Sequence, residues 1–170
     1  MPDITPDLTV QVQVELALRL ALGLGLGAAV GLERERHRQP AGFRTHSLVA
    51  LGAALFTIVG AYGFSDGDPT RVAAQIVAGI GFMGAGTILH YRGQIRGLTT
   101  AASLWAVSAV GMASGAGLYV LAILGAALIL VVLWILDEIE EAARRREYLP
   151  PPRADSSEVI RDDGKAADHE

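Results

Sequence analysis

The sequence predicts an all-α fold, a polytopic membrane helix bundle of about five transmembrane helices with glycine-rich packing. Three observations support this prediction. Hydrophobic residues make up 51% of the 170 residues, the mean hydropathy is +0.38, and charged residues account for only 19%. The charged residues are also concentrated near the C-terminus: residues 1–136 carry 15 of them, and the much shorter segment 137–170 carries 17. Finally, uncharged runs recur at the length of about 20 residues that a bilayer core requires.

These observations exclude several classes of protein. An ordinary water-soluble globule needs more polar side chains to cover its surface. A nucleic-acid-binding protein needs a cationic face, whereas the net charge here is −4. The absence of cysteine excludes a disulfide framework and a thiolate-ligated zinc site.

The uncharged runs place the helices along the chain. Residues 45–65 contain no acidic or basic residue except His46, and residues 97–136 contain none. The second run is long enough for two helices, and we expect the break at the weak helix formers of residues 114–117. The first helix takes in Glu15 and Arg19, which stand four residues apart in the favourable order for a helical ion pair. The predicted helices are 13–32, 46–64, 72–91, 98–114 and 117–136.

The two ends of the chain differ in composition from this predicted transmembrane domain, residues 13–136. Residues 1–12 form a short N-terminal segment, and the absence of Lys and Arg from residues 1–14 argues against a signal peptide. Residues 137–149 are predicted to form a charged extension of the last helix, which ends at the prolines of residues 150–152. Residues 150–170 are polar and acidic and are predicted to be disordered, either as a solvated tail or as a regulatory contact.

The distribution of arginine predicts an orientation in the membrane. Arginines gather after the first, third and fifth predicted helices, whereas the loop after the second holds Arg71 beside acidic residues and the turn after the fourth has none. By the positive-inside rule the N-terminus lies outside and the C-terminus in the cytoplasm of a multi-pass inner-membrane protein.

Glycines are concentrated in two predicted helices. In the first helix they recur every fourth residue, and in the third they are denser. Small residues let neighbouring helices approach closely, so these two helices are the predicted packing centre. These glycine-rich helix faces are expected to pack within the chain, against a second copy in a homo-oligomer, or against a membrane-protein partner. The candidate packing residues are Gly23, Gly27, Gly31, Gly79, Gly81, Gly84 and Gly86.

Polar residues at the predicted cytoplasmic helix ends form the candidate functional cluster. If the ends meet, we expect Glu33, Arg44 and Arg96 to form a partly buried ionic cluster. Three interpretations stay open: arginines that bind lipid phosphates and fix topology, ion pairs that lock the bundle, and a ligand or ion site. The cluster comprises Glu33, Arg34, Arg44, Thr45, His46, Gln75, Arg96 and Thr99.

Two of these residues have a more ordinary expected role. We expect Gln75 to form an interhelical hydrogen bond and the hydroxyl of Thr99 to suit an N-cap. Asp66 and Asp68 fit a turn better than a hydrated Mg²⁺ site. No residue is predicted to be catalytic, to bind a cofactor or to ligate a metal.

Four stretches carry a family resemblance: 27–35 (GAAVGLERE), 41–49 (AGFRTHSLV), 68–86 (DPTRVAAQIVAGIGFMGAG) and 96–105 (RGLTTAASLW). In order and spacing they resemble the MgtC/SapB family of bacterial inner-membrane proteins, over about residues 15–136. The resemblance implies a multi-span membrane domain. Some members are linked to survival in low magnesium and to intracellular virulence, and some look like regulators of other membrane proteins.

Two features depart from the family pattern. Phe43 stands where Leu is usual, and only 34 residues follow Leu136, where the virulence members look to carry a folded cytoplasmic domain. The resemblance therefore points to the shorter branch. The expected function is a non-enzymatic regulatory or accessory factor in magnesium, cation or envelope homeostasis. The alternative is a small oligomeric transporter or channel with an Arg/Glu site on the cytoplasmic side.

Overall fold

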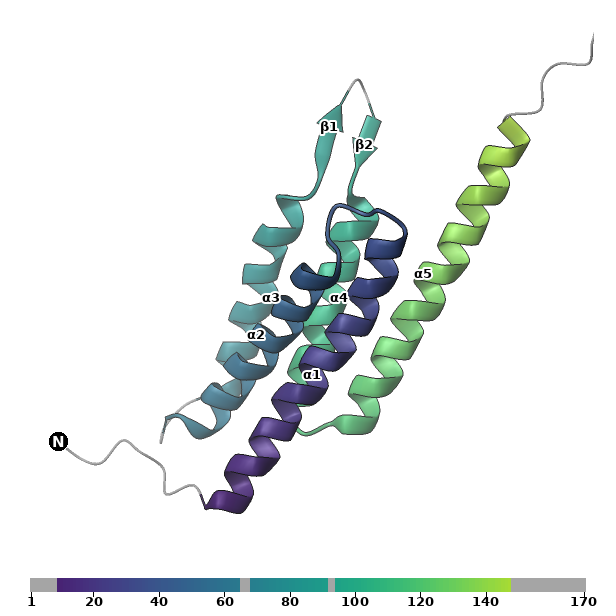
Figure 1. Cartoon of the computed structure of the whole chain (residues 1–170). Helices are drawn as coiled ribbons and strands as arrows, with labels where there is room; N and C mark the ends of the chain where they lie inside the picture. The colour runs from purple at the N-terminus through teal and green to yellow at the C-terminus, as the bar shows by residue number, and fades with distance from the viewer. Residues whose placement is uncertain (1–8, 65–67, 92–93, 148–170) are drawn as a thin grey trace, which may run out of the picture. The chain divides into compact units, whose positions relative to one another are not determined.

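The computed structural model describes residues 9–64, 68–91 and 94–147. In this part of the chain five helices follow one another, which confirms the predicted all-α class (Figure 1). Their bounds are α1 (Val10–Arg36), α2 (Phe43–Tyr62), α3 (Pro69–Ala85), α4 (Leu98–Gly115) and α5 (Tyr119–Glu147). A short antiparallel pair, β1 (Leu89–Tyr91) and β2 (Gln94–Arg96), lies between α3 and α4.

The chain divides into two compact units, residues 1–133 and residues 134–170. The first unit holds α1 to α4, the strand pair and the first part of α5. In the second unit the described residues are the remainder of α5, which is helical to Glu147. The predicted disordered segment, 150–170, and most of the predicted N-terminal segment lie outside the described residues.

Helix α2 is the centre of the first unit, and small residues bring its neighbours onto it. A Cβ atom on Gly27 of α1 would lie 2.6 Å from the Cβ atom of Ala50. On the other side, a Cβ atom on Gly115 of α4 would lie 2.5 Å from the carbonyl oxygen of Ala54. Ala50 and Ala54 are fully buried. Two alanines, four residues apart, are therefore held between glycines of α1 and α4, a close approach that only small residues permit.

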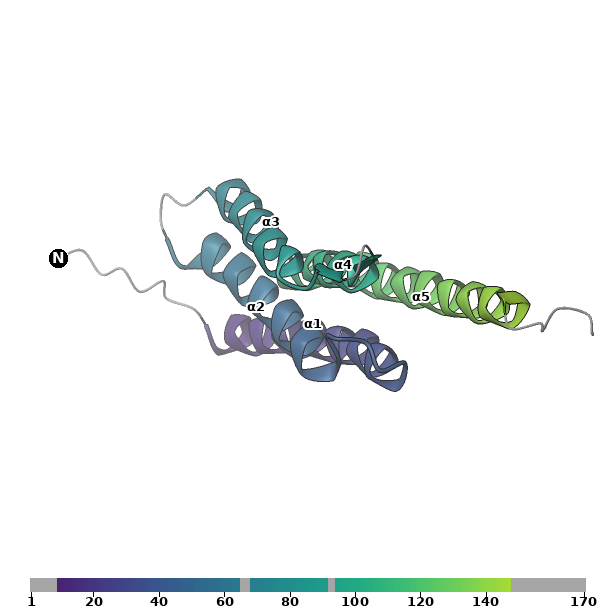
Figure 2. The ribbon, with the colours of Figure 1, turned by 90° about the horizontal axis from the view of Figure 1, so that it is seen from above.

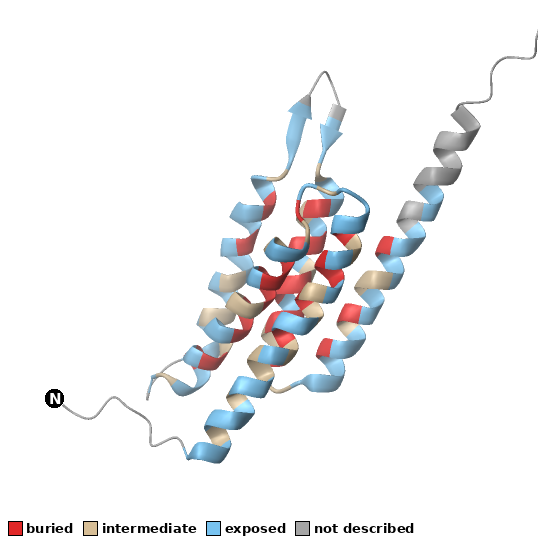
Figure 3. Cartoon of the chain, viewed as in Figure 1, coloured by how far each residue is buried: buried red, intermediate tan, exposed pale blue. Residues whose placement is uncertain are grey.

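This arrangement corrects the predicted packing centre. Helix α1 packs on α2 and α4, and α3 lies on the other side of α2 and α4 from α1 (Figure 2). Buried residues accordingly gather where α1, α2 and α4 face one another (Figure 3). The glycines of the first and third helices predicted that these two helices form the packing centre, but the helix that contacts α1, α3 and α4 is α2.

The end of α3 is a second correction. The predicted helix 72–91 stops at Ala85, because the backbone turns at Gly86 and the hydroxyl of Thr87 donates to the carbonyl of Gly84 at 2.7 Å. His90 therefore lies on β1 and not on a helix. The chain then enters α4 through Gly97, whose φ of +88° is a left-handed conformation that glycine adopts without strain.

The turn between α4 and α5 is where the sequence predicted it. Helix α4 ends at Gly115, and Gly117 has a φ of +79° before α5 begins. Within the first unit, Ala122 and Ala126 of α5 pack with Val110 of α4.

Many large hydrophobic side chains of the first unit are exposed, including Phe82 of α3 and Val120 of α5. Helices α1 and α2 are both long and apolar enough to cross a bilayer, and Tyr119–Ile135 is a shorter apolar stretch. Exposed apolar surface of this extent suits contact with lipid.

Candidate functional site

A polar network lies inside the bundle, near the end that carries the 37–42 loop and the strand pair, here called the hairpin end. His46 of α2 is fully buried, with its Nδ1 atom 3.0 Å from the carbonyl oxygen of Gly42 and its Nε2 atom 3.0 Å from Oγ of Ser103 on α4. Because a carbonyl only accepts, Nδ1 donates to Gly42. Ser103 also lies 2.9 Å from the carbonyl oxygen of Thr100, which its hydroxyl can reach as a donor.

This network can satisfy either charge state of the imidazole. In a neutral ring, Nε2 accepts the hydroxyl proton of Ser103. In a protonated ring, Nε2 donates a hydrogen bond to Oγ of Ser103, and the hydroxyl of Ser103 donates a hydrogen bond to the carbonyl oxygen of Thr100. The hydroxyl of Thr100 itself is buried and has no hydrogen-bond partner among the described residues.

A second buried feature is an ion pair at the end of α1. Arg34 is only 1% exposed, and its guanidinium donates to both carboxylate oxygens of the adjacent Glu33, at 2.7 Å to Oε1. The ring of His37 lies 3.1 Å from the same carboxylate. A two-point guanidinium–carboxylate contact is the geometry that offsets the cost of burying these charges.

The structure does not assemble the predicted cluster of Glu33, Arg44 and Arg96. Arg44 and Arg96 are exposed, and neither forms an ion pair with a residue that the structure describes. Arg96 lies on β2, and Thr99 is exposed in the first turn of α4. Helix α4 is capped by Gly97 without a side-chain hydrogen bond, so the N-cap expectation for Thr99 was wrong. Within the described ranges no group of three His, Asp or Glu side chains could hold a metal.

Arg44 instead belongs to a cavity of about 590 Å³ between α2 and α3, here called the α2–α3 groove. Its polar lining comprises Arg44, Thr45, Gln75 and, from α4, Ser108. The Gln75 side chain is exposed in the groove and forms no hydrogen bond with a described residue, contrary to expectation. The apolar walls are formed mainly by Leu48, Gly52, Phe56, Ile76, Gly79 and Met83.

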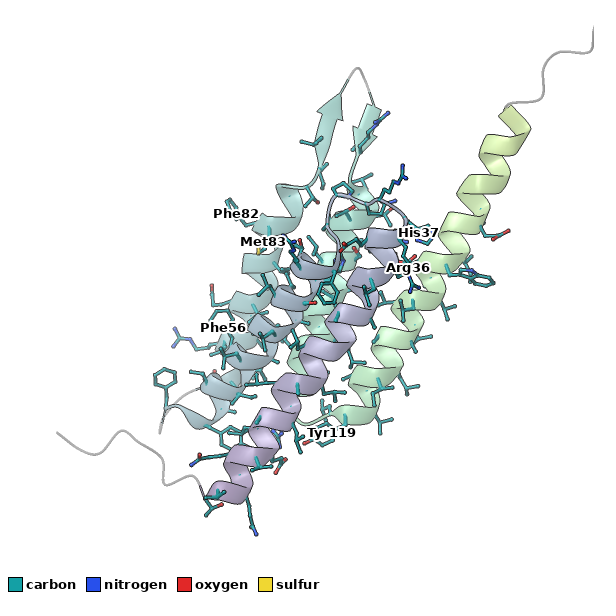
Figure 4. All side chains as sticks on the ribbon, viewed as in Figure 1. Arg36, His37, Phe56, Phe82, Met83 and Tyr119 are labelled. Carbon is teal, nitrogen blue, oxygen red and sulfur yellow. The ribbon has the colours of Figure 1, made fainter. Side chains whose placement is uncertain are left out.

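At the opposite end of the first unit, polar contacts tie α1 to the α4–α5 turn. The predicted pair of Glu15 and Arg19 is present as an ion pair. Arg19 also donates to the carbonyl oxygen of Gly115 at 3.2 Å and to the hydroxyl of Tyr119 at 3.3 Å, and the hydroxyl of Ser114 donates to the carbonyl of Arg19 at 2.7 Å (Tyr119 is labelled in Figure 4).

The predicted packing glycines fall into two groups. Gly23, Gly27 and Gly31 lie against α2, and Gly84 lies against Ala101 of α4. No described residue lies within 4 Å of the place that a Cβ atom on Gly79 or Gly81 would take, and a Cβ atom on Gly86 would meet, among the described residues, only carbonyl oxygens of its own helix end.

Sequence reasoning missed several residues of α4 that build these sites: Thr100, Ser103, Ser108, Gly111, Ser114 and Gly115. A usable signal existed, because Gly111 and Gly115 form a small-xxx-small pair inside an apolar run. The hydroxyl residues at 103 and 114 stand three helical turns apart and share that face.

The amino-acid sequence matches one known family. The MgtC family profile matches residues 20–142, which is most of the chain. The chain belongs to the MgtC family. No solved structure matches it.

Three MgtC-family relatives illustrate the similarity. The chain is 43% identical over 125 residues to the "Putative magnesium transporter YhiD" of Escherichia coli K12, covering 69% of this chain and 58% of YhiD. It is 44% identical over 126 residues to Protein MgtC of Brucella abortus, covering 72% and 53% of the two chains. With Protein MgtC of Salmonella typhimurium it shares 45% identity over 118 residues, covering 69% and 49%. The chain thus spans about half the length of the curated relatives it matches.

Proposed function

We propose that this membrane protein is a multi-pass protein of the bacterial inner membrane, with five spans, the N-terminus outside and the C-terminus cytoplasmic. Support comes from α1 to α4, which run alternately up and down (Figure 1). The 37–42 loop and the strand pair, with Arg38 and Arg96, share one end of the first unit. Basic residues favour the cytoplasmic side, so the hairpin end faces the cytoplasm.

We further propose that the chain acts as a regulatory or accessory factor and not as a conduit. The observation that carries this proposal is the closed centre of the bundle. Glycines of α1 and α4 lie directly against the backbone of α2, at His46, Ala50 and Ala54. A permeation pathway needs space and polar lining through the centre of a bundle, and the backbone contacts occupy that space.

The outer face of α3 is the surface that fits a partner helix. Ala74, Ala78, Gly81 and Ala85 are exposed and recur at intervals of four, three and four residues, which places them on one face of the helix. Phe82 beside them is 84% exposed and points away from the bundle (Figure 4). This face lies opposite the residues that line the α2–α3 groove, so both surfaces are available together.

The proposed setting is magnesium or cation homeostasis, or homeostasis of the envelope. Its support is the family and the name of the relative YhiD, which refers to magnesium transport. The charge of the interior favours an accessory role in that setting. Among the described residues, the fully buried Arg34 and the half-buried Glu33 neutralise each other, so the pair presents no net negative charge to Mg²⁺, whereas cation pathways use carboxylates or carbonyls.

The test is site-specific photo-crosslinking in cells. A photoreactive residue at position 78 of α3 should give a discrete adduct with another membrane protein, identified by mass spectrometry. The matched control is position 21, an exposed alanine of α1. Equal adducts from both positions, or lipid adducts alone, would contradict the proposed partner face. An adduct with a second copy of the chain only would replace the partner by a homo-oligomer.

A small transporter or channel is the second candidate, and one observation favours it. Arg34 is buried and paired with the half-buried Glu33, and His46 is buried in its own network, so ionisable groups lie in the interior at the hairpin end. Buried ionisable groups at membrane depth often mark ion or proton pathways. If the chain is a transporter, we expect ion or proton transport to depend on the ion pair of Glu33 and Arg34, and Glu33→Gln should abolish that transport.

A further inference from the structure

The α2–α3 groove has one open end and one closed end. At the closed end, a Cβ atom on Gly60 of α2 would lie 2.9 Å from a methyl group of Val72 on α3, so the two helices touch there. Toward the hairpin end the lining includes Arg44 of α2 and Met83 of α3, and the cavity along its whole length has a volume of about 590 Å³. Figure 4 shows Met83 nearer the hairpin end and Phe56 further along α2.

The length of the groove matches one leaflet of a bilayer. Its lining on α2 runs from Arg44 to Phe56, and twelve helical steps of 1.5 Å cover about 18 Å. One leaflet contributes about 15 Å of hydrocarbon. A transmembrane helix could lie in the groove only if the groove continued across the second leaflet. The contact between Gly60 and Val72 closes the groove there. A lipid acyl chain needs only one leaflet.

The charge at the open end is positive. Among the described residues, Arg44 lines the groove, no Asp or Glu lines it, and no ion pair involves Arg44. Arg44 and Thr45 also lie in the first turn of α2, whose amide groups and dipole favour an anion. The carboxylate of Glu35 already accepts the amide of Phe43 at 2.9 Å, so the remaining donors of this turn are those of Arg44 and Thr45 on the groove side.

We propose that the α2–α3 groove is a binding site for one anionic phospholipid from the leaflet at the hairpin end. One acyl chain lies along the groove, between Gly52 of α2 and Gly79 of α3. The phosphate group meets the guanidinium of Arg44, in a charge-assisted hydrogen bond of the kind that arginine forms with phosphate. Free phosphate is excluded as the main ligand, because the lipid acyl chain supplies most of the apolar surface that is buried in the groove.

The experiment uses the full chain in vesicles that contain phosphatidylglycerol or phosphatidylcholine with a photoreactive group at the end of one acyl chain. We expect phosphatidylglycerol to label the groove segment of α2 around Phe56. Arg44→Gln should lower this labelling about tenfold, since a hydrogen bond to a charged group is lost. Phosphatidylcholine, whose choline cation offsets the charge of its phosphate, should label more weakly, and its labelling should change less in Arg44→Gln. The matched control is Arg36→Gln, an exposed arginine at the same end that does not line the groove.

A second pair of variants tests the apolar part without touching the charge. A Cβ atom on Gly52 or on Gly25 would meet no described residue within 4 Å, but of the two only Gly52 lines the groove. Gly52→Leu should abolish labelling at Phe56, and Gly25→Leu should leave it intact, with both variants folded. Labelling that is equal for both lipids in the wild-type chain, or unchanged in Gly52→Leu, would overturn the proposal. So would displacement of the lipid by inorganic phosphate alone, which would indicate an anion site without the acyl chain.

Discussion

The Nε2 atom of His46 lies 3.0 Å from Oγ of Ser103, and this contact joins α2 to α4 inside the bundle. Both side chains are buried, and Ser103 in turn reaches the carbonyl of Thr100. The contact therefore holds the hairpin ends of two helices together by side-chain hydrogen bonds, in addition to the backbone contacts nearer the middle of α2.

Removing the hydroxyl of Ser103 should destabilise the protein. Ser103→Ala leaves Nε2 of His46 buried without its partner, which costs about 1–3 kcal/mol. The matched control is Thr100→Val, because the Thr100 hydroxyl has no partner among the described residues and its loss should leave stability equal or higher. The free energy of unfolding in detergent micelles measures both. Equal losses for the two variants would contradict the hydrogen bond between Ser103 and His46.

Adding a methyl group between α2 and α4 should be costly. A Cβ atom on Gly111 would overlap the carbonyl of Ala50, and backbone atoms cannot move aside cheaply. We expect Gly111→Ala to lose about 1–3 kcal/mol through overpacking. Gly25→Ala, on the open face of α1, should show no such loss. Thermal unfolding of the two variants side by side is the measurement, and a stable Gly111→Ala variant would exclude the close contact.

The ion pair of Glu33 and Arg34 should show strong coupling. Arg34→Met removes the buried guanidinium and leaves the half-buried carboxylate with His37 but without this partner, at a cost of about 1–3 kcal/mol. The double variant Glu33→Gln with Arg34→Met removes both charges and should recover part of the loss. A double-mutant cycle from unfolding free energies gives the coupling. Strictly additive effects would show that the pair does not stabilise the fold.

The start of α3 should depend on pH through Asp68. The side chain of Thr70 donates to the Asp68 carboxylate, as does the Thr70 amide, and these hydrogen bonds hold the pKa of Asp68 below its usual value. A carboxyl whose pKa is lowered by folding stabilises the fold above its unfolded pKa, and the effect disappears as pH falls through the lowered value. The cap should therefore persist until pH falls below the ordinary aspartate range.

The amide resonance of Thr70, followed by NMR as the pH is lowered, reports this titration directly. Its midpoint should lie below that of an unstructured aspartate. In Asp68→Asn the side-chain oxygen can still cap the helix but does not titrate, so the resonance should stay constant over the same range. A midpoint at or above the ordinary value would contradict the cap.

The sequence predicted the number of helices and most of their positions because runs of apolar residues report burial in lipid directly. It also predicted that Gly23, Gly27 and Gly31 serve close packing. It could not say which helix they meet. A glycine face permits a close approach by any helix. Helix α2 contacts α1 through Ala50 and Ala54, and two alanines in an apolar run give no distinctive sequence signal.

The predicted site was less accurate than the fold. The expectation that Glu33, Arg44 and Arg96 meet assumed that all four helix ends converge, but the strand pair carries Arg96 away from α1 and Arg44 faces the groove. A strand pair of three residues each gives almost no periodic signal. Glu33 instead pairs with its neighbour in sequence, a contact that helical spacing does not favour.

The central claim is that the chain acts through its lateral surfaces and not through its centre. The most direct measurement is Mg²⁺ influx into liposomes that contain the purified protein and a trapped Mg²⁺-sensitive dye. We expect the same influx as in liposomes without protein. Influx that requires the protein, and that disappears in a folded Glu33→Gln variant, would contradict it and establish the transporter.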